Sequence, residues 1–484
     1  MQSYIYSTAT ELALLIRNGS VSSTEIVKQH FAQIHAHNKQ INALVALFEE
    51  DALERAREAD DALKQGEIWG PLHGVPVTVK EQFWIKGTPC TVNAKMYKDF
   101  VAPEDAVVVE RLKKSGAIII GKTNVPAFLI DFQTKGDIYP EGKNPYNMDY
   151  TTGGSTGGGA AALAAGFTPL ELGGDFGGSA RIPPAFCGVY GLKPTEKTVP
   201  IKGNHPILPN MKGGLVQMVQ PAMIARSPDD IRLLWEIIRG PHESDRSIAP
   251  MKWQEPSGKA LKEYRIAWAD GWENCEVSRQ TKNSINELID RFTATGGFAE
   301  KKVPDSIQNS RMVNLYILLF SYIAAQDMPW FVKFFFKRQL RNGVVRGRKD
   351  YQKIIAKGLK MRVRDYAQAQ KVRTEIIQDW ELFFKKYDFF VCPVAFGPAF
   401  KRCEAGAPIE YDGVKVLYPD YCVPHVTIFN ATGHPALVVP LGLSEEGLPM
   451  SVQIVGAYWS EPELLHFANQ LSSILPGFIK PAGF

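Results

Sequence analysis

The feature that most constrains this sequence is a glycine-rich run at residues 151–195, TTGGSTGGGAAALAAGFTPLELGGDFGGSARIPPAFCGVYGLKPT. It contains twelve of the 41 glycines in less than a tenth of the 484 residues. They gather in two clusters, GGSTGGG at 153–159 and GGDFGGS at 173–179, and each cluster contains a serine. Glycine is used where the backbone adopts a positive φ or approaches another group closely. Because an apolar, helix-like segment lies between the clusters, we expect two shaped loops around a reacting group rather than flexible linkers.

The composition is that of a large folded protein, with 45% hydrophobic and 22% charged residues. A net charge of +4, without a zinc-finger or RNA-binding motif, argues against nucleic acid as a partner. The six cysteines form no Cys-x-x-Cys pair and the nine histidines include no HExxH, so we expect no metal site and reduced cysteines, which fit the cytoplasm. The N-terminus lacks a signal-peptide pattern, and no apolar run reaches the ~18 residues needed to span a bilayer.

The hydrophobic pattern predicts an α/β fold in a single domain. The first 66 residues read as helices, with capping-box spacing at 8–11 and 22–25. A β-branched strand at 75–79 ends at Lys80, and a helix at 105–115 precedes a strand at 117–120. A strand–helix–strand series predicts a parallel or mixed sheet with helices against it. Further helices are expected at 227–240, 276–296 and 461–474, and further strands at 265–269, 389–394, 436–443 and 451–455.

Three kinds of chemistry could use the glycine clusters. A phosphate-binding loop needs Gly-Lys-Ser/Thr after the glycines, and neither cluster has it. An α/β-hydrolase-type esterase with Ser155 as nucleophile matches GxSxG, with His425 or His434 as its base, but the preceding residues are not the strand that a nucleophile elbow requires. The third possibility uses both clusters: Ser179 is the nucleophile, and neutral Lys80 is the base that acts through Ser155.

The motifs together resemble the amidase signature family. The core GGSTGGGAAALAAG…LGGDFGGSARIPPAFCGVYGLKPT carries this resemblance, with GVPVTVKE and GKTNVP upstream and FNATGHPALVVPLG and GLPMSVQIVG downstream. The match is strong over 70–195 and 429–456 and weak between about 200 and 385. It implies a large mixed central β-sheet covered by helices on both sides. We expect one amidase domain made of N-terminal helices (1–66), the signature core (70–200), a variable substrate-binding or cap region (200–385) and a C-terminal part of the core (386–484).

The resemblance also implies a site. In the family's pattern, the nucleophile falls on Ser179, the bridging serine on Ser155 and the base on Lys80, with a cis peptide before Ser155. We expect Asp175 and Arg181 to brace the nucleophile's loop through an ion pair, with a solvent-facing Arg181 as the alternative. No cofactor or metal is implied. The oxyanion hole of the family falls on the backbone N–H groups of Phe176, Gly177, Gly178 and Ser179.

Two features bear on the substrate, which the resemblance implies is a small-molecule amide. Leu129 and Ile130 fall where the family lines its pocket, and both are apolar. The block at 312–340 mixes Leu, Phe and Trp with Lys and Arg, which fits a pocket lid that touches a membrane, a buried core, or a contact in a homodimer. These apolar residues favour an apolar or aryl acyl group, and leave ester and carbamate cleavage open.

The family contains both free-standing hydrolases and the glutaminase subunit of glutamyl-tRNA amidotransferase, which works in a larger assembly. The first group includes enzymes that act on aryl acylamides, fatty acid amides and nylon oligomers. After Thr195 this chain continues as EKTVPIKGNHPILPN, which lacks the run "GRVSR…SSLDQ" typical of the glutaminase. We therefore expect a free-standing amidase, and the main alternative is the glutaminase subunit.

Overall fold

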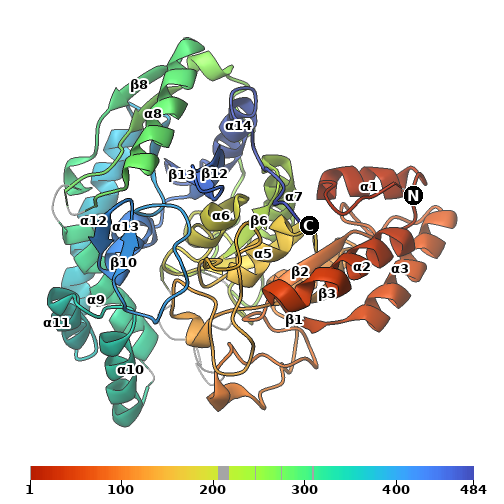
Figure 1. The fold of residues 1–484 in the computed structure, drawn as a ribbon, viewed down its shortest axis with the longest axis horizontal. Helices are drawn as coiled ribbons and strands as arrows, with labels where there is room; N and C mark the ends of the chain where they lie inside the picture. The colour runs from red at the N-terminus through yellow and green to blue at the C-terminus, as the bar shows by residue number, and fades with distance from the viewer. Residues whose placement is uncertain (1, 205–216, 246, 274, 308–309, 327) are drawn as a thin grey trace.

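One eleven-stranded mixed sheet runs through the protein, as its computed structural model shows (Figure 1). The structure describes residues 2–204, 217–245, 247–273, 275–307, 310–326 and 328–484. Part of the stretch that lacks the amidotransferase pattern, residues 205–210, and residue 327 of the 312–340 block lie outside the described residues. In spatial order the strands are β1 (Leu44–Leu47), β3 (Ile118–Thr123), β2 (Pro76–Lys80), β4 (Leu170–Asp175), β6 (Gln220–Ala225), β5 (Tyr190–Lys193), β12 (Ala436–Leu443), β13 (Pro449–Gly456), β9 (Phe389–Pro393), β7 (Arg265–Trp268) and β8 (Phe298–Lys301).

The sheet mixes parallel and antiparallel pairs, as the sequence predicts. β2 pairs in parallel with both β3 and β4, whereas β4 pairs antiparallel with β6. β12 and β13 form an antiparallel hairpin that joins β5 to β9, and β10 (Ile409–Tyr411) and β11 (Val414–Val416) form a separate small sheet. Each of the four expected parts of the chain therefore contributes strands to the same large sheet.

Helices cover both faces of the sheet, so its central strands are buried on both sides. Val77, Val79 and Leu172 face one core, which includes side chains of the helices labelled α7 and α14. Ile120 and Ile224 face the other core, against the helix labelled α5. The helices are α1 (Ala9–Arg17), α2 (Ser23–Ile41), α3 (Glu49–Lys64), α4 (Val107–Lys114), α5 (Gly157–Ala164), α6 (Ile182–Cys187), α7 (Pro228–Ile238), α8 (Arg279–Ala294), α9 (Arg311–Ala325), α10 (Trp330–Asn342), α11 (Lys349–Gly358), α12 (Val363–Phe384), α13 (Val423–Thr432) and α14 (Glu461–Leu471).

Local signals position the N-terminal helices. Thr8 and Glu11 form the complete capping box at α1, because each side chain binds the backbone N–H of the other. At α2 the Ser22 hydroxyl caps the N–H of Glu25, but the Glu25 carboxylate instead accepts a hydrogen bond from Gln29. The caps are therefore predictable from spacing, although the second box is only half formed.

The prediction that residues 1–66 are helical is wrong for β1. These four residues form an edge strand that pairs antiparallel with β3, with Leu44 opposite Thr123. So short an apolar run has no periodicity of its own, and its backbone takes the strand conformation because the edge of β3 offers hydrogen-bond partners.

The block at 312–340 divides between the core and the surface. Helix α9 is buried and packs against α11, α12 and α13. Helix α10 lies at the molecular edge remote from α1–α3 (Figure 1), and its Trp330, Phe334 and Phe335 are 83%, 60% and 63% exposed. Within the described part of the chain, no helix is long and apolar enough to cross a bilayer.

Candidate active site

Lys80 is the last residue of β2, and its side chain is almost completely buried, at 1% exposure. Side chains alternate along a strand, so Lys80 points away from the core that holds Val77 and Val79 and towards α5. Its Nζ lies 2.8 Å from Ser155 Oγ and 3.5 Å from the Gly174 carbonyl oxygen. Burial lowers the pKa of Lys80 to about 7, against the opposing effect of nearby carboxylates. The neutral amine is therefore accessible near neutral pH.

Ser155 connects this lysine to Ser179. It precedes α5, and the peptide bond between Gly154 and Ser155 is cis, as the resemblance implies. Its Oγ lies 2.9 Å from Ser179 Oγ, so Lys80, Ser155 and Ser179 form an unbroken hydrogen-bonded chain. Ser179 is partly exposed and lines a cavity. The two glycine clusters thus meet at their serines.

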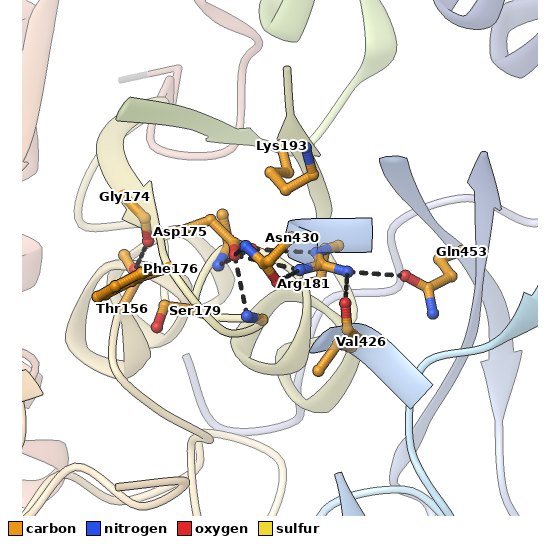
Figure 2. A network of polar contacts seen from close by, with 12 residues as sticks. Thr156, Gly174, Asp175, Phe176, Ser179, Arg181, Lys193, Val426, Asn430 and Gln453 are labelled. Carbon is orange, nitrogen blue, oxygen red and sulfur yellow. Dashed lines mark hydrogen bonds and ion pairs between the residues drawn. The ribbon is translucent and has the colours of Figure 1, made fainter. Parts of the chain in front are cut away.

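A buried ion pair holds the turn that carries Ser179 (Figure 2). Asp175 accepts hydrogen bonds from the N–H groups of Gly178 and Ala180 and from the Nδ2 of Asn430. Arg181 donates from Nε and Nη2 to the two carboxylate oxygens, at 3.0 and 3.1 Å. Burial alone would raise the pKa of Asp175, but Arg181 and these donors hold it below its usual range. Arg181 is fully buried, so the solvent-facing alternative for its side chain is wrong.

The same turn offers backbone donors for an oxyanion. In the described structure, the N–H groups of Phe176, Gly177 and Ser179 have no acceptor. The N–H of Gly178 differs, because it donates to Asp175 Oδ1 at 2.9 Å. The N–H of Gly178, which is among the expected donors, is thus already engaged in fixing the turn, whereas the other three expected N–H groups have no acceptor among the described residues.

Above Ser179 lies a cavity of about 430 Å³ with mainly apolar walls. Leu129 and Ile130 line it, next to Phe128 and Phe132. Another part of the wall comes from α9 and α10, whose contributions include Tyr316, Ile317, Phe320, Phe331, Phe335 and Phe336. Among the described residues that line this cavity, Lys80 is the sole cation, and Asp131 and Asp175 are the acids.

Several residues around the site were not predicted from the sequence. The Tyr316 hydroxyl donates to the Phe176 carbonyl at 3.0 Å, but nothing in the pattern of α9 distinguishes this tyrosine. Asn430, which binds Asp175, lies within the FNATGHP motif and could have been found there. Glu171 carries the clearest missed signal, since it is a carboxylate between Leu170 and Leu172 in an otherwise apolar, buried strand.

The structure gives no support to the α/β-hydrolase alternative. Ser155 follows a loop rather than a strand, and its side-chain partners are Lys80 and Ser179. The Nε2 of His425 lies 3.2 Å from the Glu276 carbonyl, and that of His434 contacts Glu381. Nor do the described residues contain a cluster of His, Cys, Asp or Glu that could hold a metal ion.

Comparison with known proteins places this geometry in a family. The family model described as Amidase matches residues 25–465. Curated relatives include the A subunit of glutamyl-tRNA(Gln) amidotransferase from Thiobacillus denitrificans, 32% identical over 499 residues, and its counterpart from Synechococcus sp., 31% identical over 479 residues. These alignments cover 96% and 94% of this chain and the same shares of the relatives.

Solved structures share the whole fold. A 6-aminohexanoate cyclic dimer hydrolase in complex with its substrate has a TM-score of 0.80 and 25% identity, with 99% of both chains covered. A bacterial aryl acylamidase has a TM-score of 0.81 at 23% identity, covering 97% of this chain and 96% of its own. A family model over nearly the whole chain, relatives above 30% identity and a common fold lead to one conclusion: the chain belongs to the amidase signature family, whose members hydrolyse amide bonds.

Proposed function

We propose that the protein hydrolyses apolar acyl or aryl amides through an acyl-enzyme on Ser179, with Ser155 and Lys80 as its proton relay. The observation that carries this proposal is the unbroken chain from Lys80 Nζ to Ser155 Oγ, at 2.8 Å, and on to Ser179 Oγ, at 2.9 Å. A serine hydroxyl is a weak nucleophile until a base takes its proton. Lys80 can act as that base near neutral pH because burial lowers its pKa to about 7.

In the first half-reaction Ser179 Oγ attacks the carbonyl carbon of the amide. Its proton passes to Ser155, whose own proton passes to neutral Lys80. Hydroxyl groups both donate and accept hydrogen bonds, so the direction of the chain reverses when Lys80 is neutral. The N–H groups of Phe176 and Gly177, with that of Ser179, would bind the oxyanion that develops.

To complete the first half-reaction, the relay then runs in the opposite direction. Protonated Lys80 returns a proton through Ser155 to the leaving nitrogen, the C–N bond breaks, and the amine departs. The acyl group remains as an ester on Ser179. Water then attacks this ester, gives its proton to the same relay, and releases the carboxylic acid as Ser179 recovers its proton.

The cavity supports the choice of an apolar acyl group. Its walls are mostly aromatic and aliphatic, and α9 and α10 contribute to them together with Leu129 and Ile130. Burying apolar substrate surface there contributes about 25 cal/mol per Å². We propose that the 312–340 block acts as a wall of this pocket.

The second candidate is the glutaminase subunit of an amidotransferase, because the curated relatives are named as amidotransferase subunits. Free glutamine has an α-carboxylate that needs a cationic partner when it is buried. Among the described residues of the cavity wall, Lys80 alone is cationic, and the mechanism requires it to be neutral. This lining favours the free-standing amidase.

One experiment tests the reaction and distinguishes the two candidates. Purified protein, with no partner added, is assayed against p-nitroanilides with acetyl to decanoyl groups and against glutamine. We expect anilide hydrolysis that improves with acyl length and no glutaminase activity. Glutamine hydrolysis without anilide hydrolysis would instead favour the amidotransferase role.

We predict that Ser179→Ala and Lys80→Met each lower turnover by about 10³-fold or more. Lys193→Met is the matched control, since Lys193 is a second buried lysine whose pKa burial lowers to about 7, yet its Nζ binds the Pro194 carbonyl rather than a serine. Far-ultraviolet circular dichroism checks folding. A folded Ser179→Ala variant with near-normal turnover would eliminate this mechanism.

A further inference from the structure

Glu171 emerges on the same face of the sheet as Lys80. In the parallel pair of β2 and β4, Thr78 lies opposite Glu171, and alternation places Lys80 on the face of Thr78. The flanking Leu170 and Leu172 face the opposite core. Glu171 and Lys80 therefore both point towards α5, from neighbouring strands.

The surroundings of the Glu171 carboxyl are unusual for a buried acid. Oε1 accepts a hydrogen bond from the Thr123 hydroxyl at 2.6 Å, whereas Oε2 has no hydrogen-bond partner in the described structure. Helix α5 approaches it through Gly159, where a Cβ would lie 2.3 Å from Oε1. The absence of a side chain at Gly159 thus makes the space for this carboxyl. A buried carboxyl group with a hydrogen-bond partner on only one of its two oxygens costs stability.

Two carboxylates act on the charge of Lys80: Asp175 and Glu171. Asp175 is held ionised by Arg181, which also balances its charge. Glu171 differs, since burial raises its pKa to about 7, against the effects of the Thr123 and Thr78 hydroxyls and the Lys80 charge. Of the two acids, Glu171 is therefore the one whose charge changes in the pH range in which Lys80 loses its proton.

We propose that Glu171 is a positioning residue that controls the protonation of Lys80 and so sets the pH range in which Ser179 is activated. This inference rests on the proposed function, because it takes Lys80 as the base. Glu171 touches neither Ser155 nor Ser179 in the described contacts, and it acts through Lys80 alone.

The direction of the effect follows from charge. An ionised Glu171 stabilises the Lys80 ammonium, so the lysine releases its proton at a higher pH than it would beside a neutral group. The two groups titrate as a coupled pair, and the acid limb of the rate profile belongs to the pair. Replacing the carboxyl with an amide leaves Lys80 free to become neutral at lower pH.

The test is the pH profile of kcat/KM for Glu171→Gln with a p-nitroanilide substrate. We expect the midpoint of the acid limb to move about one pH unit to the acid side. One unit below the wild-type midpoint, the variant then keeps about fivefold more of its own plateau rate than the wild type keeps. The rate at which a fluorophosphonate labels Ser179 should show the same shift, independently of the amide substrate.

Glu461→Gln is the matched control. Glu461 is also fully buried, accepts a hydrogen bond through Oε1 from the Thr195 N–H, has no partner on Oε2 among the described residues, and has a pKa raised by burial. It does not act on Lys80. We expect its acid limb to coincide with that of the wild type.

Thr123→Val is a second variant that keeps the carboxyl. Loss of the hydroxyl removes the donor to Oε1, which disfavours the ionised acid, so the limb should move in the same direction by a smaller amount. An unchanged limb in folded Glu171→Gln, with Lys80 still required for labelling, would overturn the role of Glu171 alone. If the fluorophosphonate instead labels Ser179 fully in Lys80→Met, Lys80 is not the base, and the proposed function is overturned with it.

Discussion

Lys80 is held in the folded protein with a pKa near 7, whereas the ordinary value for lysine is 10.5. In the pH range between these values the unfolded chain binds a proton at Lys80 and the folded chain does not. Stability rises with pH wherever the unfolded state binds more protons. Lys80 therefore disfavours folding at neutral pH, and this penalty diminishes as the pH approaches 10.5.

We predict that the stability of the wild type relative to Lys80→Met increases with pH. The gain from about pH 7 to pH 10 should be on the order of 4 kcal/mol. Urea unfolding of both proteins across this range measures it, and subtracting the two curves removes the contribution of Lys193, which both proteins retain. A difference that is flat with pH would mean that folded Lys80 keeps an ordinary pKa.

Tyr316 of α9 leaves no room for a side chain at Gly177. A Cβ on Gly177 would lie 2.4 Å from the Tyr316 hydroxyl oxygen, and the next atom of that ring is 3.4 Å away. We predict that Gly177→Ala displaces the turn and lowers kcat on the order of 100-fold, the loss typical of a damaged oxyanion hole. The added Tyr316→Phe substitution should restore much of this rate, because it removes the clashing oxygen.

Tyr316→Phe alone serves as the control for this pair and should change kcat little. Steady-state kinetics of the four proteins, two single variants, the double variant and the wild type, give the coupling between the positions. If the double variant is no faster than Gly177→Ala, the loss does not come from this contact.

Among the elements, α10 provides a sharp test of substrate size. Phe334 and Phe335 are neighbours with nearly equal exposure, 60% and 63%, but Phe335 lines the cavity and Phe334 does not. We predict that Phe335→Ala raises KM for a decanoyl anilide about fivefold and leaves KM for the acetyl anilide unchanged. Phe334→Ala should affect neither substrate, and equal effects of the two variants would argue against α10 as part of the pocket wall.

Elements with a strong local pattern are predictable from this sequence. β2, α4 and α7 lie close to their expected positions because their apolar spacing, and at α7 also the capping residue Ser227, are local properties. β1 and β6 were not predicted, since both take strand form through hydrogen bonds to partners distant in sequence. Pairing of that kind leaves little trace in the strand itself.

The candidate site likewise divides into residues that the sequence predicts and contacts that depend on how the chain folds. The sequence predicts Ser155 and Ser179 from the glycine clusters and Lys80 from its place at the end of a strand, and the resemblance implies the same three residues. The structure places Lys80 within hydrogen-bond reach of Ser155. The N–H of Gly178 could not be assigned without coordinates, because its direction depends on the Asp175 carboxylate. Nor could the contact of Tyr316, which depends on how α9 packs against the turn.

At the scale of the whole molecule, Arg181 connects distant parts of the chain. Besides Asp175, it donates to the Val426 carbonyl at 2.7 Å and to Gln453 Oε1 at 3.2 Å, and it also contacts Asn430 (Figure 2). We predict that Arg181→Met lowers the free energy of unfolding by about 3–5 kcal/mol, because it leaves the Asp175 charge buried and unbalanced. Urea unfolding measures this loss.

Lys64→Met is the control, since its ion pair with Asp61 is exposed, and it should leave the free energy of unfolding almost unchanged. Combining Arg181→Met with Asp175→Asn should recover part of the stability, because the uncompensated charge is then gone. If the double variant is less stable than Arg181→Met by as much as Asp175→Asn alone destabilises the wild type, the two side chains do not act as a pair.

The contacts of Arg181 also depend on residues that are synthesised much later than Arg181 itself. Val426, Asn430 and Gln453 follow Arg181 by 245, 249 and 272 residues, so they are made long after Lys80, Ser155 and Ser179. Until those residues arrive, the Ser179 turn lacks the groups that surround its ion pair. We therefore expect a chain that has passed Arg181 to add at least 245 further residues before the Ser179 turn gains this support, and to show no hydrolytic activity until then.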